Sequence, residues 1–173
     1  LKPYKNCFTF ALMKFSEVIG LEHIKNHVIK STDNGRISHA QLLSGKEGTG
    51  LLAMAIAYAQ YILASSNENP ESSNIKCEKL MHPDLHFAFP VSTNDKIRSK
   101  PVSNHFLEEW REFVLHKPYG NLFEWLQSIG VENKQGQIGV DEAEEIVKAL
   151  KLKSYEGGYK IMIIWMAEKM NIS

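Results

Sequence analysis

The sequence predicts an α/β fold in which helices cover both faces of a parallel β-sheet, so that the domain has three layers. Three short apolar segments have the composition of buried strands, namely residues 40–43, 85–91 and 159–165. Segments with the apolar spacing of helices lie between them. Because parallel strands are usually joined through a helical crossover, strands that alternate with helices indicate a parallel sheet.

The composition is that of an ordinary globular domain. The chain has 173 residues, of which 43% are hydrophobic, and its formal net charge is zero. That length can bury a proper core, and the charge gives no sign of direct nucleic-acid binding. Cys7 and Cys77 are too few for a disulfide framework, and no apolar run approaches the roughly 20 residues that span a membrane. We therefore expect a soluble cytoplasmic protein.

The expected folded unit occupies residues 13–173. Residues 1–12 show no apolar period, so we expect them to be a non-native or disordered extension. At the other end, a helix that begins near Ala167 would leave one face of the sheet uncovered before the sequence reaches Ser173. We therefore expect the domain to be truncated after its last strand.

The expected helices have apolar residues three and four positions apart. They cover residues 21–28, 51–63, 106–113, 122–129 and a segment capped by Asp141. The polar residues 65–73 are predicted to form a loop. Trp110 and Trp125 are interpreted as core side chains rather than as a platform for stacking bases.

A glycine-rich loop follows the first expected strand. Gly45 and Gly50 have the spacing of a phosphate-binding loop, whose backbone N–H groups and following helix hold polyphosphate. The loop consists of Gly45, Lys46, Glu47, Gly48, Thr49, Gly50, Leu51 and Leu52. A working loop ends in Lys and Ser or Thr, which contact phosphate and Mg²⁺, and leucines can do neither. Lys46 is an alternative source of positive charge.

A second defect lies at the end of the last expected strand. ATP hydrolysis needs a carboxylate there to hold Mg²⁺ and orient water. The sequence places Trp165 and Met166 at this point, and Glu168 follows too late to be in line. Defects at both ends of the metal site argue against ATP hydrolysis.

A zinc site is the remaining candidate for metal chemistry. Cys77, His82 and His86 have a spacing compatible with zinc ligands. A fourth ligand is missing, and His86 lies inside an expected strand. We therefore interpret these side chains as ordinary surface or capping residues, and no set of nucleophile, histidine and acid points to another reaction.

Several short motifs, taken together, resemble the clamp-loader branch of the AAA+ ATPases. The motifs are FSEVIG at 15–20, RISHA at 36–40, the glycine loop at 45–50, His-Pro-Asp at 82–84, IGVDE at 138–142 and Tyr-Lys at 159–160. The two defects resemble the delta-prime-type members of bacterial DNA polymerase III clamp loaders. The resemblance implies a P-loop NTPase-like AAA+ domain, truncated after the Walker B strand and without its lid and collar domains.

The resemblance also assigns roles to residues. It implies that Val18 and Ile19 lie beside a nucleotide pocket and that Trp165 and Met166 are a degenerate Walker B end. Many members carry a four-cysteine zinc module, but residues 64–81 retain only Cys77, so zinc is not expected. The arginine finger and the collar would lie beyond the last residue.

The function implied by the resemblance is structural. Such a subunit does not hydrolyse ATP and forms a rigid part of the ring that loads the sliding clamp in DNA replication, within the DNA polymerase III holoenzyme. Its implied partners are the gamma/tau and delta subunits, with the sliding clamp and primer–template DNA reached indirectly and no membrane. Neither ATP nor zinc is expected as a cofactor. Two alternatives stay open: an active clamp-loader-type ATPase, and a domain that holds nucleotide without hydrolysing it.

Overall fold

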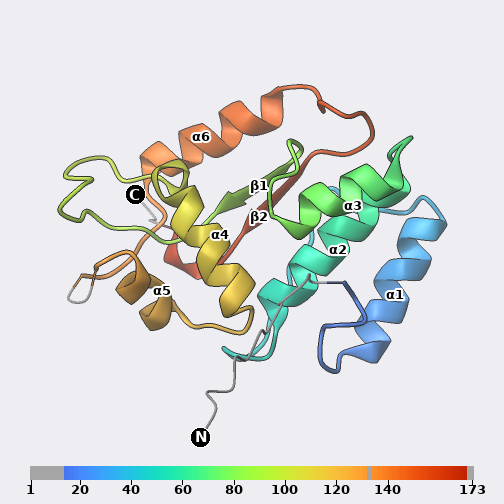
Figure 1. The fold of residues 1–173 in the computed structure, drawn as a ribbon, viewed down its shortest axis with the longest axis horizontal. Coiled ribbons are helices and arrows are strands. Elements are labelled where there is room, and N and C mark those ends of the chain that lie inside the picture. The colour runs from blue at the N-terminus through green and yellow to red at the C-terminus, as the bar shows by residue number, and fades with distance from the viewer. Residues whose placement is uncertain (1–13, 132–133, 171–173) are drawn as a thin grey trace, which may run out of the picture.

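A computed structural model describes residues 14–131 and 134–170. The expected extension at 1–12 lies outside these ranges. Figure 1 shows the order of the elements along the chain. They are α1 (Glu22–Asp33), α2 (Leu51–Ser65), α3 (Pro70–Glu78), β1 (Leu85–Ala88), a 3₁₀-helix (Ser103–Phe106), α4 (Leu107–His116), α5 (Leu122–Ser128), α6 (Val140–Lys151), β2 (Ile161–Ile164) and a second 3₁₀-helix (Ala167–Lys169).

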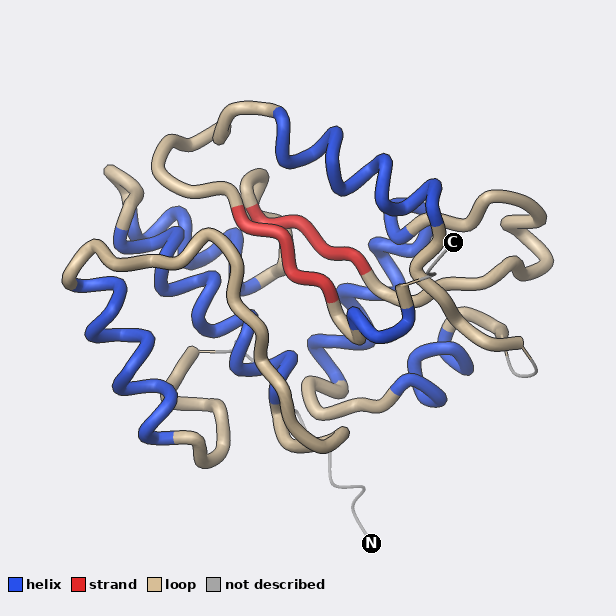
Figure 2. The backbone as a smooth tube through the Cα atoms, turned by 180° about the vertical axis from the view of Figure 1, so that it is seen from behind, coloured by secondary structure: helices blue, strands red, loops and turns tan. Residues whose placement is uncertain are grey.

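The two strands form a parallel pair, as the sequence predicts. Leu85 is opposite Ile161, and Ala88 is opposite Ile164. The crossover between them contains α4, α5 and α6. The main core cluster joins β1 to α2, α4 and α5, whereas α6 contacts both strands and contributes no buried residue to that cluster. The strands therefore lie between two helical layers, with α6 running alongside them in Figures 1 and 2.

The prediction of a third strand at 40–43 is wrong for the described part of the chain, whose sheet has two strands. Residues 37–44 belong to the long connection between α1 and α2 (Figure 2). No backbone hydrogen bond joins 37–44 to another described segment, and Leu42 is 83% exposed. An apolar sequence becomes a strand when a neighbouring strand pairs with it, and no described strand pairs with this segment. The described residues therefore form an α/β fold with a two-stranded parallel sheet, and they do not show the three-layer P-loop sheet.

β1 is shorter than the predicted 85–91 strand. Beyond Ala88, the N–H of Phe89 donates to Ser103 Oγ at 2.9 Å instead of to a strand. Pro90 has no N–H to donate. Val91 then forms an isolated antiparallel bridge with Gln137. The apolar run therefore continues through the core after the strand has ended.

The predicted loop at 65–73 is wrong in its second half, which begins α3. Asn69 caps this helix by accepting the N–H of Ser72 at 3.0 Å, and Pro70 occupies the first turn. Both are signals of a helix start. The apolar spacing used to predict helices did not detect this one, because the helix has almost no apolar face. The residues that it buries are Ser73 and Cys77.

The last two elements also differ in detail from expectation. α6 begins after Gly139, and the expected cap Asp141 lies inside its first turn, where its carboxylate pairs with Lys100 at 2.8 Å. The helix expected near Ala167 is a single 3₁₀ turn, which follows Met166 in a left-handed conformation. In the described residues, no helix is long and apolar enough to cross a membrane.

An aromatic cluster fills the core between β1 and the helices. The Trp110 ring stacks on Phe89 with centroids 4.1 Å apart, and it meets Trp125 edge-on at 5.2 Å. Trp165, at the end of β2, lies 5.2 Å from the same ring. The Trp125 indole donates to the carbonyl of Pro90 at 2.7 Å. The interpretation of Trp110 and Trp125 as core residues is confirmed.

Replacing Trp110 with alanine should severely destabilise the fold, because the indole is fully buried and contacts several rings. We expect Trp110→Ala to lower the free energy of unfolding by about 3–5 kcal/mol in urea denaturation. The control, Phe123→Ala, removes a ring that is largely exposed and should change stability by no more than about 0.5 kcal/mol. Equal effects of the two variants would contradict this description of the core.

Candidate functional site

The glycine loop forms a tight turn at the start of α2. Gly48 and Gly50 have φ values of 78° and 83°, in the left-handed region that glycine adopts at little cost. The Thr49 hydroxyl donates to the carbonyl of Lys46 at 2.6 Å and closes the turn. Residues 45–49 are exposed, whereas Gly50 is buried at the helix start. The strand before the loop is missing, but the loop-to-helix junction is as predicted.

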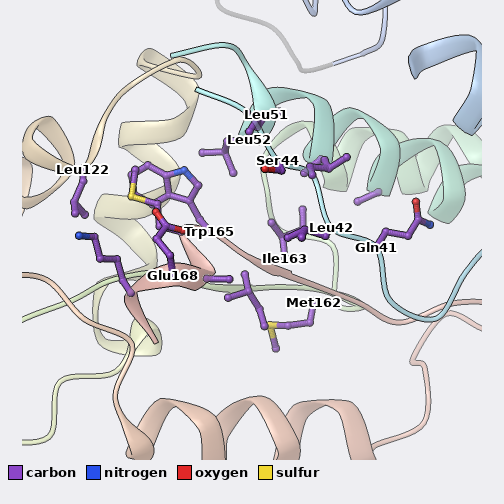
Figure 3. A pocket seen from close by; sticks show the side chains of 18 of the residues that line it. Gln41, Leu42, Ser44, Leu51, Leu52, Leu122, Met162, Ile163, Trp165 and Glu168 are labelled. Carbon is purple, nitrogen blue, oxygen red and sulfur yellow. The ribbon is translucent and has the colours of Figure 1, made fainter. Parts of the chain in front are cut away.

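The two leucines at this junction make packing contacts within the protein. Leu52 is buried in the main core cluster. Leu51 bends back over the loop, so that a Cβ added to Gly45 would lie 3.4 Å from one of its methyl groups. In Figure 3 both side chains lie at the edge of the pocket near Trp165. The position of a phosphate-binding lysine is therefore taken by an apolar side chain that contacts the loop itself.

A large cavity lies between the glycine loop and β2. Its volume is about 1720 Å³, and its walls include residues 37–48, 118–123 and 159–169. Figure 3 shows mainly apolar side chains around it, among them Leu42, Met162 and Ile163, together with Glu168. It is larger than the roughly 300–1,000 Å³ of a typical ligand pocket.

The end of β2 reaches the same cavity without a carboxylate in line with the strand. The backbone N–H of Trp165 donates to the carbonyl of Ala88 at 2.8 Å, and its ring belongs to the aromatic core. Met166 turns the chain with φ 56°. Glu168 lines the cavity from the following turn (Figure 3). The loop and the strand end therefore line the same cavity, with apolar residues at both.

Val18 and Ile19 do not line this cavity. Val18 is buried in a second core cluster, and its carbonyl accepts the ammonium group of Lys25 at 2.5 Å. Ile19 is 78% exposed, and its N–H donates to the hydroxyl of Tyr119 at 2.9 Å. The segment at 15–20 is thus fixed by contacts within the protein.

The weak metal candidates Cys77, His82 and His86 are buried or partly buried. Burial raises the pKa of the Cys77 thiol to about 12, which keeps it protonated and disfavours metal binding. His82 Nδ1 accepts the N–H of Asp84 at 3.1 Å, and its Nε2 lies 3.2 Å from a Glu156 oxygen. Burial lowers the pKa of His86, which lies on β1. No group of three or more potential metal ligands is found within 14–131 and 134–170.

Asp84 is a structural residue whose role the sequence did not reveal. Its buried carboxylate accepts the N–H of Tyr155 at 2.7 Å and that of Glu156 at 2.9 Å. Its carbonyl accepts the N–H of Ile161 at 2.8 Å, at the first residue of β2. Glu156 in turn pairs with Lys76 and accepts from Asn67. The His-Pro-Asp motif was the available signal, and its aspartate fixes the loop that leads into β2.

Comparison with known proteins gives one match. The family model described as "DNA polymerase III, delta subunit" matches residues 20–173. No curated protein and no solved structure matches the chain.

Acidification should destabilise the protein partly through His82. Burial is the main cause that lowers its pKa from 6.5. The negative charges of Glu156 and Asp84 act to raise the pKa, and the positive charge of Lys76 adds a smaller lowering. The unfolded chain therefore takes up this proton first, and stability present above pH 6.5 is lost as the pH falls. We expect His82→Gln to flatten the stability curve between pH 7 and 5.5 by no more than about 1.4 kcal/mol per pH unit.

The control for this measurement is His23→Gln, which makes the same substitution at an exposed histidine on α1. His86 contributes in the same direction as His82, because burial also lowers its pKa. Glu142 contributes in the opposite direction, because burial raises its pKa. The comparison is therefore between each variant and the parent protein in urea denaturation. An unchanged slope in His82→Gln would contradict the assignment.

Proposed function

The chain belongs to the family described as DNA polymerase III, delta subunit, and from this premise we propose that it is a non-hydrolysing, delta-prime-type subunit of the clamp loader. Membership makes it a clamp-loader-type subunit of DNA polymerase III. The observation that carries the finer proposal is the apolar character of the loop and of the strand end that meet at one cavity. Leu51 and Leu52 stand on one side, and Trp165 and Met166 on the other.

The chemistry of phosphoryl transfer explains why this arrangement is catalytically silent. Catalysis there depends on positioning the phosphates and on neutralising the charge that develops on them. The loop offers no cation at its helical end, because Leu51 contacts Gly45 and Leu52 belongs to the core. Among the described residues, Glu168 is the single acid near the strand end, and neither a hydroxyl side chain nor a second acid in line with the strand is there to help it hold Mg²⁺. The site therefore serves packing.

We also propose that the complete sheet is of the three-layer AAA+ type, with a further strand between β2 and residues 40–43. β2 reads Ile-Met-Ile-Ile, a composition suited to a strand covered on both sides, yet none of the four is buried. Among the described residues, the edge of β2 away from β1 and the backbone of 37–44 have no backbone partner, and both segments line the same cavity. Two unpaired segments on either side of an apolar cavity support a further strand between them.

The proposed partners follow from the family. They are the gamma/tau and delta subunits, with the sliding clamp and primer–template DNA reached through the complex in the cytoplasm. Zero net charge supports indirect rather than direct contact with DNA. The proposal includes no ATP or zinc cofactor.

One observation favours a second candidate, a domain that holds nucleotide without hydrolysing it. The cavity is large, and the exposed Lys46 is among the residues that line it. A lysine in the loop could supply charge to a phosphate from an unusual position. Binding measurements separate the two candidates.

The native protein should neither bind ATP–Mg²⁺ at micromolar concentration in calorimetric titration nor hydrolyse it faster than about 1 s⁻¹. The double variant Leu51→Lys, Leu52→Thr should lose about 1.5–3 kcal/mol of stability through the buried Leu52. It should still not bind ATP tightly, because the strand-end acids remain absent. Micromolar binding by the native protein, abolished by Lys46→Ala, would favour the nucleotide-holding candidate instead.

The free edge of β2 should promote self-association of the 173-residue chain. An exposed apolar edge is a template for pairing, and a lysine on it prevents pairing. We expect Ile164→Lys to reduce concentration-dependent association in sedimentation velocity. Ile75→Lys changes an exposed isoleucine on α3 and is the matched control. If both variants associate like the parent protein, the edge of β2 does not mediate self-association.

A further inference from the structure

Residues 118–122, here called the strap, connect α4 to α5 and form part of the cavity wall. The strap is fixed at both ends. On one side, a Cβ added to Gly120 would lie 2.6 Å from the ring of Phe113, so a larger residue does not fit. On the other, Asn121 and Glu124 cap α5 reciprocally through their side chains and backbone N–H groups. These contacts hold Gly120 and Asn121 in place directly after Tyr119.

The strap contacts the glycine loop twice. A Cβ added to Gly50 would lie 2.5 Å from Cε1 of Tyr119, so the tyrosine ring lies directly on the last glycine of the loop. The carboxylate of Glu47, inside the loop, accepts the N–H of Leu122 at 3.2 Å. One contact is steric and the other places a negative charge at the loop. Both disfavour an anionic ligand at the start of α2, where the free N–H groups of a helix would otherwise attract one.

Tyr119 also reaches a third segment. Its hydroxyl accepts the N–H of Ile19 at 2.9 Å, across a sequence separation of 100 residues. Its ring packs against the second core cluster, which contains Val18 from the same segment and Ala53 and Met54 from α2. One side chain therefore touches the 15–20 segment, the loop and the helix that follows it.

We propose that Tyr119 is a built-in plug, which closes the glycine loop and locks it to the 15–20 segment. The inference rests on the proposed function, since it explains how a loop released from nucleotide binding is kept shut by the chain's own residues. The loop then acts as the anchor for the α4–α5 connection. Glu47 assists by fixing the strap and by opposing anions.

Hydrogen exchange of the backbone amides tests directly whether Tyr119 holds the glycine loop and the 15–20 segment in place. Tyr119→Phe removes the acceptor for the Ile19 N–H and keeps the ring, so exchange should rise about tenfold in 15–20 and stay unchanged in 45–53. Tyr119→Ala removes both contacts, so exchange should rise in both segments. Tyr119→Leu also removes the ring and the hydroxyl but keeps an apolar side chain, so it replaces the alanine variant if that variant does not fold. Unchanged exchange in 45–53 after loss of the ring would overturn the plug.

A titration with ADP and with inorganic pyrophosphate tests the closure. We expect no heat from the native protein or Tyr119→Phe at millimolar ligand, and binding at least tenfold stronger in the double variant Tyr119→Ala, Glu47→Gln. If the folded double variant binds no better than the native protein, the plug is wrong while the proposed function stands. If the native protein binds ADP at micromolar concentration, the proposed function fails.

Discussion

The buried carboxylate of Asp84 is the interaction on which the rest of the arrangement depends. It accepts two consecutive backbone N–H groups, from Tyr155 and Glu156, and its own carbonyl accepts from the first residue of β2. A buried carboxylate without such partners would cost several kcal/mol, so the loop before β2 has one acceptable position. That position sets the register of β2 against β1. It thereby brings Trp165 to the cavity that the glycine loop also lines.

Under the proposed function, the consequence is an architecture related to nucleotide-binding domains that has lost nucleotide chemistry. In this proposal, Leu51 and Leu52 stand where a lysine and a metal-binding hydroxyl would be, and Trp165 stands at the strand end. Leu52 and Trp165 belong to the main core cluster. In the proposed plug, Tyr119 adds a steric barrier from the α4–α5 connection, and Glu47 adds a negative charge within the loop itself. If the chain is the rigid subunit proposed above, it benefits from this exchange, because packing contacts would persist while neighbouring subunits bind and release ligands.

Local sequence predicted much of this architecture. The apolar runs at 85–91 and 159–165 gave the parallel pair, and the glycine spacing gave the start of α2. The failures have physical causes. Residues 40–43 are strand-like in composition, but strand formation depends on a partner elsewhere in space. α3 is polar all round and was visible through its Asn-Pro start alone. The contacts of Asp84 and Tyr119 join segments that are far apart in the sequence, as with Asp84 to Tyr155 and Tyr119 to Ile19, and no local pattern encodes them.

The nucleotide content of the purified protein tests the central claim most directly. A working loop of this kind often retains its ligand, whereas a plugged, apolar loop has none to retain. Denaturing extraction followed by ion-exchange chromatography measures bound ATP and ADP per chain. The account predicts far less than stoichiometric nucleotide, with or without added Mg²⁺. One ATP or ADP per chain, retained through desalting, would contradict it.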